Sequence, residues 1–211
     1  MTLTAKASSI KKGKFITLEG MDGAGKSTHI PTIIVLLQAR GLEVVSTREP
    51  GGTPLGEKLR ALLLHEPMHA ETETLLMFAA RREHIANVIE PALARGAYVL
   101  SDRFTDATYA YQCGAKGVLA HKIKQIETWV QGDLRPDATL LFDVPVEISL
   151  QRLATAREPD KFECENAQFF EKLRQAYLLR AAENANIFHV IDANQPINKV
   201  KVIVEKIIAT L

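Results

Sequence analysis

Short hydrophobic runs alternate along the chain with longer stretches in which hydrophobic residues recur at helical spacing. The short runs predict buried strands, and the amphipathic stretches predict helices between them. The strands are expected over 15–20, 43–47, 97–102, 138–143 and 187–192, and the helices over 27–40, 55–64, 71–95 and 197–211. This alternation predicts an α/β fold: a doubly wound, five-stranded parallel sheet with helices on both faces and ligands at the carboxyl ends of its strands.

The composition excludes several functional classes. Lys and Arg number 26 against 25 Asp and Glu, so a chain that coats nucleic acid or an anionic membrane is not expected. No apolar run approaches the length needed to span a membrane. Cys113 and Cys164 are expected to be free thiols in a reducing compartment. Residues 1–13 lack the apolar core of a signal peptide and are expected to form a flexible lead, so we expect a cytoplasmic protein with one domain over 14–211.

A complete phosphate-binding motif follows the first predicted strand. Residues 20–27, Gly-Met-Asp-Gly-Ala-Gly-Lys-Ser, match G-x-x-x-x-G-K-[ST] between a strand and a helix, as that motif requires. The glycines would let backbone N–H groups surround a phosphate, Lys26 would reach the β- and γ-phosphates, and the Ser27 hydroxyl would bind Mg²⁺. The sequence therefore predicts ATP binding with Mg²⁺. The residues expected to bind ATP are Gly20, Met21, Asp22, Gly23, Ala24, Gly25, Lys26, Ser27 and Thr28.

The remainder of the chain narrows the class of phosphate-binding protein. A GTPase would be expected to carry Asn-Lys-x-Asp, whereas residues 198–201 read Asn-Lys-Val-Lys, and a large ATPase motor would need more chain. A small-molecule kinase must hold a second anion facing the γ-phosphate, so arginines are expected in the loops at the same edge of the sheet. Arg48 follows the second strand, Arg103 the third, and Arg152 and Arg157 the fourth. Any one of them alone could be a solvated surface charge, but arginine's planar fork suits bidentate phosphate binding.

Further motifs resemble the thymidylate kinase family, whose members phosphorylate dTMP to dTDP with ATP. The resemblance runs from about Lys14 to the C-terminus and is carried by EGMDGAGKST (19–28), TREPGGT (47–53), LMFAARR (76–82), DRF (102–104), AYQ (110–112) and RPD (135–137). It implies a three-layer P-loop kinase fold, a homodimer, and a short lid at about 152–166. Gly23 stands where eukaryotic relatives carry an arginine, which implies the bacterial type with lid arginines. Which of Arg152 and Arg157 meets the γ-phosphate stays open.

The resemblance also implies roles at the phosphate end of the site. Arg48 and Arg103 would hold the phosphate of dTMP, and the Glu49–Pro50 peptide would be cis. Asp102 would act on the Mg²⁺ shell through water, together with Ser27, and Glu163 would touch the same shell. The residues expected to act on the transferring phosphoryl group are Lys26, Arg103, Arg152 and Arg157.

At the nucleoside end, the resemblance implies that Phe78 stacks on the thymine ring. Arg82, one helical turn further along, would hydrogen-bond the base. Tyr111 would crowd the 2′ position and favour deoxyribose, and Asp22 would bind the sugar 3′-hydroxyl. Without the resemblance, Phe78 or Tyr111 could equally be an aromatic residue of the core. The other side chains expected to read the base are Thr108 and Gln112.

Three alternative functions are weighed against this one. Residues 65–69 read His-Glu-Pro-Met-His and match the zinc protease motif, but that motif needs one continuous helix, and Pro67 disfavours it. A kinase for another nucleoside or nucleoside monophosphate differs in its preferred acceptor. A P-loop switch protein would bind ATP and transfer nothing to an acceptor, and the arginines at the strand ends argue against it.

Overall fold

The computed structural model describes residues 13–154 and 160–211, and its centre is a parallel sheet of five strands. The strands, in sheet order, are β2 (Val44–Arg48), β3 (Tyr98–Asp102), β1 (Phe15–Glu19), β4 (Ala138–Asp143) and β5 (Phe188–Asp192). Because β1 pairs with β3 on one side and β4 on the other, the chain winds in opposite directions from β1, and ligands bind where such a winding reverses. The five predicted strands are confirmed, each to within one residue at either end.

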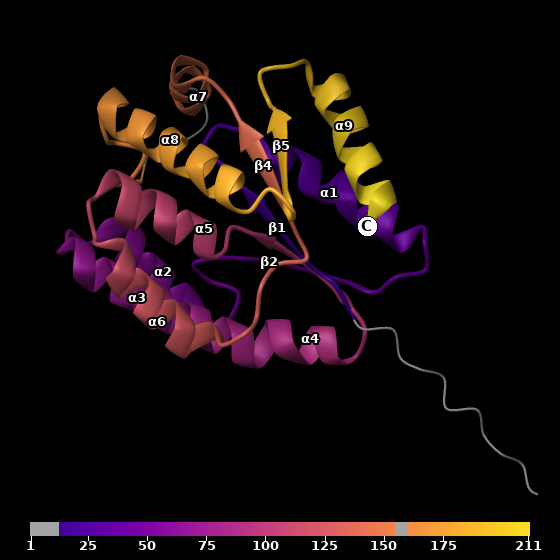
Figure 1. Ribbon diagram of the computed structural model, residues 1–211, viewed down its shortest axis with the longest axis horizontal. Helices are drawn as coiled ribbons and strands as arrows, with labels where there is room; N and C mark the ends of the chain where they lie inside the picture. Colours follow the sequence, from indigo (N-terminus) through magenta and orange to yellow (C-terminus); the bar gives the residue numbers. More distant parts are fainter. Residues whose placement is uncertain (1–12, 155–159) are drawn as a thin grey trace, which may run out of the picture.

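Helices cover both faces of this sheet, which confirms the predicted α/β fold. The helical elements of the described residues are α1 (Lys26–Gln38), α2 (Pro54–His65), α3 (Ala70–His84), η1 (Ile85–Ile89), α4 (Glu90–Ala94), α5 (Thr105–Thr108), η2 (Tyr109–Ala115), α6 (Ala120–Gln131), α7 (Val146–Leu153), α8 (Ala167–Glu183) and α9 (Ile197–Thr210). Figure 1 shows α1 and α9 on one side of the strands, with α4, α5, α8 and the neighbouring helices α2, α3 and α6 on the other.

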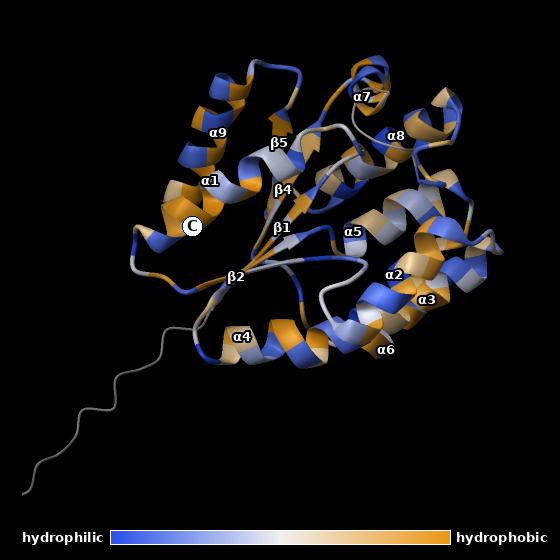
Figure 2. Ribbon diagram, turned by 180° about the vertical axis from the view of Figure 1, so that it is seen from behind, coloured by the Kyte–Doolittle hydropathy of each residue, from blue (hydrophilic) through white to orange (hydrophobic). Residues whose placement is uncertain are grey.

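Residues on the two faces of β1 pack in two different hydrophobic clusters. Ile16 and Leu18 pack in the cluster that contains Val204 of α9, whereas Phe15, which points to the other face, packs with Ile89 at the end of η1. All the strand residues named here are fully buried. In Figure 2, β4 and β5 are largely in the hydrophobic colour, and α9 shows both colours, as a helix with one face on the core should. This buried sheet fixes where the loops at the carboxyl ends of the strands begin.

The helix predicted over 71–95 is helical throughout but consists of three segments, α3, η1 and α4. Pro91, in the first turn of α4, has no N–H to donate, and the wider π-helical turns of η1 immediately precede it. The sequence pattern did not predict the helices over 105–131 and 146–183, several of which pack on one another rather than on the sheet. A β-carbon at Gly114 of η2, for example, would lie 2.4 Å from the Ala176 side chain of α8.

Some predicted features fall partly or wholly outside the described residues. Of the lead expected over 1–13, only Gly13 is described, and of the expected lid the structure describes 152–154 and 160–166. Arg157 lies outside the described residues. Among the helices that are described, none combines the length and the apolar character needed to cross a membrane.

Candidate functional site

The loop between β1 and α1 is built on glycines in the left-handed region. Gly23 has φ 75° and Gly25 has φ 94°, conformations that residues with a β-carbon rarely adopt. A β-carbon at Gly23 would also lie 2.7 Å from the carbonyl oxygen of Ser149, so the loop packs directly on α7. The buried ammonium of Lys26 donates to the Gly20 carbonyl oxygen at 2.9 Å. The phosphate loop and its lysine are therefore held in place by the protein alone.

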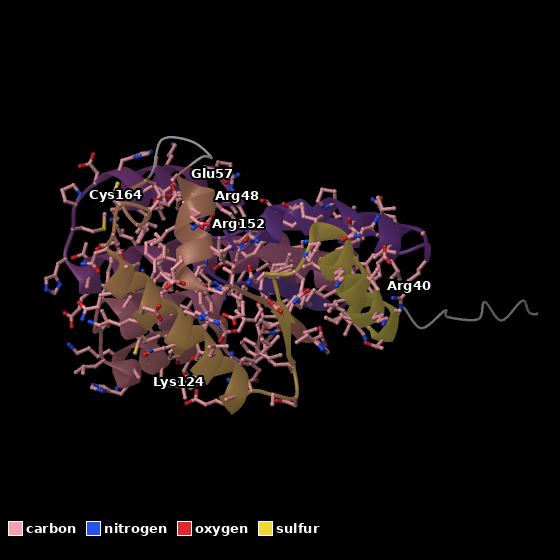
Figure 3. The ribbon with its side chains drawn as sticks, turned by 90° about the horizontal axis from the view of Figure 1, so that it is seen from above. Arg40, Arg48, Glu57, Lys124, Arg152 and Cys164 are labelled. Carbon is pink, nitrogen blue, oxygen red and sulfur yellow. The ribbon has the colours of Figure 1, made fainter. Side chains whose placement is uncertain are left out.

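A cavity beside this loop, which we call the phosphate cavity, brings most of the predicted phosphate-side residues together. Arg48 of β2 lines it and donates to Glu57 at 2.9 Å. Figure 3 shows Arg48 and Arg152 close to one another near the middle of the upper edge of the molecule, with Glu57 beside Arg48. The predicted residues that line this cavity are Asp22, Gly23, Gly25, Lys26, Ser27, Thr28, Arg48, Asp102, Arg103, Arg152 and Glu163.

A second cavity, which we call the nucleoside cavity, adjoins the first, because the two share lining residues. Aromatic and aliphatic side chains form part of its wall, and a few polar groups converge on it, the usual composition of a site for a small organic molecule. Its apolar lining includes Met77, Phe104, Tyr111 and Phe162, and its polar lining includes Arg81, Thr108 and Gln112. This cavity therefore contains four of the side chains that the sequence predicts at the nucleoside: Asp22, Thr108, Tyr111 and Gln112.

The structure does not bring Phe78 and Arg82, which the resemblance places at the base, into this cavity. Met77 and Arg81 line the nucleoside cavity, whereas Phe78 is buried in the core and Arg82 is half-exposed, donating to the Val130 carbonyl oxygen at 2.8 Å. Both pairs are one helical turn apart, so the spacing alone does not distinguish them. The glutamate that follows β2 holds Arg81, since Glu49 accepts from Arg81 Nε at 2.7 Å inside the protein.

Four residues line both cavities and mark the junction between them. They are Asp22, Glu49, Arg60 and Arg103. The junction therefore presents two guanidinium groups, those of Arg60 and Arg103, where the cavity for an organic molecule meets the cavity beside the phosphate loop. Guanidinium groups bind phosphate bidentately.

Arg103 has the most constrained position at this junction. Its φ is 71°, the left-handed region that costs a residue with a β-carbon about 1–2 kcal/mol. The guanidinium donates to Asp22 at 2.7 Å, the Tyr111 hydroxyl at 2.9 Å, the Tyr177 hydroxyl at 2.8 Å and the Gly20 carbonyl oxygen at 3.0 Å. The strained backbone and these four contacts together fix the charge at the junction.

Asp22 is held as a carboxylate by the same network. Burial alone would raise the pKa of Asp22, but the positive charges of Arg103 and Lys26 and the hydrogen bond from the Tyr111 hydroxyl outweigh it. The pKa of Asp22 therefore lies below its ordinary value. A carboxylate that remains ionised accepts hydrogen bonds and donates none, so Asp22 can accept from a hydroxyl group of a bound molecule.

A third cavity lies on the other side of the phosphate loop. Ala24 and His29 line it with Gln195, which follows β5. Arg152 lines both this cavity and the phosphate cavity, and it donates to the carbonyl oxygens of Gly23 at 3.2 Å and Ala193 at 3.1 Å. The arginine thus lies beside the phosphate loop, between the third cavity and the phosphate cavity.

Arg60 is a site residue that the sequence analysis missed. It donates to the Pro50 carbonyl oxygen at 2.9 Å, and burial lowers its pKa from the ordinary arginine value. A signal was present in the sequence, because Arg60 comes one turn after Gly56 and one turn before Leu64 on the inner face of α2. A charge in the buried stripe of a helix is a reason to suspect a site.

Two buried polar atoms in these cavities have no hydrogen-bond partner among the described residues. They are Nη1 of Arg81, a residue that lines the nucleoside cavity, and Oδ1 of Asp102, a residue that lines the phosphate cavity. Leaving such an atom unpaired costs about 1–3 kcal/mol, so native proteins rarely do so without a ligand or water that pairs with it. Both residues are therefore candidates for polar contact with a bound molecule, water or ion.

The zinc-protease match over 65–69 is not assembled into a metal site. His65 ends α2, and His69 caps the start of α3, so the two histidines do not share one continuous helix. Within residues 13–154 and 160–211, no group of three or more His, Cys, Asp or Glu side chains is suited to hold a metal ion. The Glu49–Pro50 peptide is cis, as the resemblance implied.

Glu19 is a titratable group buried beneath the phosphate loop. The Phe104 N–H donates to Oε1 at 2.7 Å, and the Tyr177 hydroxyl donates to Oε2 at 3.0 Å. Burial raises the pKa of Glu19 from 4.5 to about 7; the Asp106 carboxylate adds to this and Arg103 opposes it. Between these two pH values, the folded chain holds a proton that the unfolded chain has released.

We expect this proton to make the free energy of unfolding fall as the pH rises through that window, by about 3 kcal/mol for Glu19 alone. Glu19→Gln removes the titrating group and keeps an oxygen for the Phe104 N–H. We compare the free energy of unfolding of the variant with that of the unaltered chain. From about pH 4.5 to about pH 7.5, this difference should shift in favour of the variant by about 3 kcal/mol. Urea unfolding at both pH values measures this. An equal difference at the two values would contradict it.

Comparisons with known proteins agree with this geometry. The family model described as thymidylate kinase matches residues 18–204. The thymidylate kinase of Methylobacillus flagellatus is 69% identical over 190 residues, covering 90% of this chain and 94% of that protein. That of Cupriavidus metallidurans is 64% identical over 200 residues, covering 95% of this chain and 100% of that protein.

A solved structure is similar as well. The crystal structure of thymidylate kinase from Ehrlichia chaffeensis has a TM-score of 0.75 and 33% sequence identity, covering 93% of this chain and 98% of that chain. The family model spans the phosphate loop and all the residues that line the nucleoside cavity. The chain belongs to the thymidylate kinase family.

Proposed function

We propose that this chain transfers the γ-phosphoryl group of ATP to dTMP, giving dTDP and ADP, with the two nucleotides end to end across the junction of the cavities. The observation that carries this arrangement is the junction itself, where Asp22, Arg60 and Arg103 line both cavities. ATP would extend along the phosphate loop, and dTMP would occupy the nucleoside cavity with its phosphate at the two arginines. The acceptor phosphate is already an anion, so no strong general base is needed.

The proposed catalysis is positioning and charge compensation. Lys26 and Arg103 would offset the repulsion between two anions and the charge that spreads over the transferring group, which is the main requirement in phosphoryl transfer. Arg48 would support the dTMP phosphate, and Arg152 the ATP phosphates, each from its place on the phosphate cavity. Residues 152–166 are proposed to act as the lid, with Arg157 as a second lid arginine.

The proposed reading of the nucleoside follows the polar groups of its cavity. The unpartnered Nη1 of Arg81 would donate to a carbonyl oxygen of the base, in the role that the sequence assigned to Arg82. Gln112 would bind the base edge, and Thr108, which accepts from Arg81 Nη2 at 3.0 Å, would support that arginine. Asp22 would accept from the sugar 3′-hydroxyl, with Tyr111 packed beside it.

Mg²⁺ is proposed as the ion that accompanies ATP, held by Ser27 and, through water, by Asp102. The unpartnered Oδ1 of Asp102 and the exposed Ser27 side chain belong to the same cavity. Such a donor set fits an ion that takes few protein ligands and keeps several waters, and Glu163 on the same cavity fits that hydrated shell. When bound, Mg²⁺ offsets the negative charge of the phosphates.

We also propose that the chain acts as a homodimer in the cytoplasm. Exposed leucines on α2 and α3, at Leu62 and Leu75, support a partner surface there, since apolar residues at an interface become buried on association. Both cysteines are free thiols, which fits a reducing compartment. Sedimentation of the purified chain tests the first proposal, and cell fractionation tests the second.

The test of the reaction is ADP release from ATP, measured with each nucleoside monophosphate and with thymidine, in the presence and absence of Mg²⁺. We expect dTMP to be far better than AMP, CMP or thymidine, with no turnover when Mg²⁺ is chelated. A better acceptor among the others would assign the chain to another kinase activity. ATP binding with no dTMP-dependent ADP release would point to a switch protein instead.

Within that assay, Arg81→Lys and Arg82→Lys form a matched pair on adjacent residues of one helix. Arg81→Lys keeps a cation for Glu49 but removes the fork that faces the cavity, so we expect KM for dTMP to rise at least about tenfold. Arg82→Lys should change KM less than about twofold, because its side chain lies outside the cavity. The reverse order of effects would restore Arg82 as the base-binding residue.

A further inference from the structure

Glu73 is a fully buried carboxylate that neither the sequence motifs nor the proposed function uses. It lies in the first turn of α3 and is 0% exposed. Lys116, which follows η2, approaches both carboxylate oxygens at 2.9 Å, and Lys161 approaches Oε2 at 2.9 Å. The amide nitrogen of Gln112 donates to Oε1, also at 2.9 Å. One carboxylate thus joins α3 to η2 and to the segment that follows 155–159.

The contact with Glu73 determines which way round the Gln112 amide lies. A carboxylate accepts hydrogen bonds and donates none, so the nitrogen of the amide must face Glu73. The amide oxygen is then the end left to receive a hydrogen bond. Since Gln112 lines the nucleoside cavity and is itself 1% exposed, this oxygen makes Gln112 an acceptor toward whatever binds there.

That orientation distinguishes one class of pyrimidine from another. Thymine and uracil carry an N–H at ring position 3, which an amide oxygen accepts. Cytosine has a lone pair at the same position, which an amide oxygen opposes. A site built to accept a hydrogen bond discriminates strongly against a molecule that cannot donate it, because the buried acceptor is then unpaired.

The same carboxylate holds part of the cavity wall. The Lys161 ammonium, bound to Glu73, also donates to the Glu66 carbonyl oxygen at 3.0 Å. The Phe162 ring lines the nucleoside cavity with the ammonium groups of Lys116 and Lys161 at 4.4 Å and 5.1 Å from its centroid. Breaking the Glu73 contacts would therefore loosen this wall as well as free the Gln112 amide.

We propose that Glu73 is a positioning residue for pyrimidine selectivity, which fixes the amide of Gln112 with its oxygen toward the base and ties the segment around Phe162 over the same cavity. Base reading and the enclosure of the base then depend on one buried carboxylate. This inference rests on the proposed placement of the base beside Gln112.

The experiment compares Glu73→Gln with Glu71→Gln. Glutamine is nearly isosteric with glutamate but can also donate, so Gln112 is no longer forced into one orientation. We expect the ratio of kcat/KM for dTMP to that for dCMP to fall at least about tenfold, mainly through KM. The ratio for dTMP to dUMP should stay constant, because both bases carry the same N–H. Glu71, an exposed residue on the same helix as Glu73, pairs with Lys122 of α6, and Glu71→Gln should leave both ratios unchanged.

Loss of the negative charge could destabilise the protein by leaving two ammonium groups facing each other. The double variant Glu73→Gln with Lys116→Met restores the balance of charge, and the fall in the dTMP to dCMP ratio should persist in it. Lys161→Met keeps the contact between Glu73 and Gln112, so we expect it to raise KM for dTMP without changing that ratio. A changed ratio in Lys161→Met would overturn the role assigned to the amide.

Gln112→Leu separates this inference from the function on which it rests. If Gln112→Leu leaves the dTMP to dCMP ratio intact, Gln112 does not read the base, and the proposed placement of the base fails. If Gln112→Leu lowers the ratio while Glu73→Gln and the double variant do not, the placement stands and the role of Glu73 is overturned. A fall in all three variants supports the inference.

Discussion

Arg103→Ala is expected to lower kcat for phosphoryl transfer by a factor of about 10³–10⁵, the range found for arginines that compensate charge in phosphoryl transfer. The reason is structural as well as electrostatic. The guanidinium lies at the junction of the two cavities and is held there by Asp22, Tyr111 and Tyr177. Removal takes away the charge and frees the Asp22 carboxylate, so KM for dTMP should rise too. Steady-state kinetics with dTMP and ATP measure both effects.

A control and a second variant sharpen this result. Arg95→Ala removes an exposed arginine that pairs with Glu43, away from both cavities, and should leave the kinetics unchanged. Arg103→Gly should be as inactive as Arg103→Ala yet more stable by about 1 kcal/mol, because glycine adopts the left-handed backbone without strain. Near-normal kcat in both Arg103 variants would remove this residue from the mechanism.

Lys26→Met is expected to lower kcat by a factor of at least about 10²–10³, the loss seen when one preorganised electrostatic group is removed from a transition state. The Lys26 ammonium is buried beside the phosphate loop and donates to loop carbonyl oxygens, so it is already at the place where the ATP phosphates are proposed to lie. Methionine preserves the length of the side chain and the packing of α1.

The matched control for this variant is Lys58→Met, which changes an exposed lysine of α2. Thermal unfolding of both variants separates loss of catalysis from loss of fold. We expect Lys26→Met to keep the melting transition and dTMP binding while ADP release stops. Turnover within about tenfold of the unaltered chain would be too small a loss for a group that meets the transferring phosphate.

The parts of the fold that the sequence predicts are those with strong local signals. Each buried strand is a short hydrophobic run, and the glycines of the phosphate loop require backbone conformations that few other residues tolerate. The helices over 105–131 and 146–183 were not predicted, although α6 and α7 each carry a regular hydrophobic stripe that could have indicated them. The close approach of Gly114 to Ala176 depends on the tertiary structure and cannot be read from either segment alone.

The choice between Arg81 and Arg82 shows where motif spacing stops being informative. Two arginines are adjacent, and each has a residue one turn earlier that could share its face. The phase of α3 decides between them: Arg81 and Ile85 come seven and eleven residues after the buried Thr74, close to two and three whole turns. A helical pattern that counted Thr74 as buried would have selected Arg81.

The role of Glu73 was beyond any such pattern. Its partners Gln112, Lys116 and Lys161 are far away in the sequence, and only the fold brings them to one carboxylate. A glutamate in the first turn of a helix is also common for a local reason, since negative charge is favourable there. The sequence therefore gave no reason to distinguish Glu73 from the exposed Glu71.

Gly23 limits how this enzyme can evolve. A β-carbon at that position would stand 2.7 Å from the Ser149 carbonyl oxygen and 3.3 Å from the Leu153 side chain, so any other residue pushes α7 away from the loop. Arg152 belongs to α7 and would be displaced with it. A single mutation that introduced an arginine into the loop would therefore displace the arginine that we propose for the ATP phosphates. An arginine at position 23 would therefore require further mutations that rebuild the contact between the loop and α7.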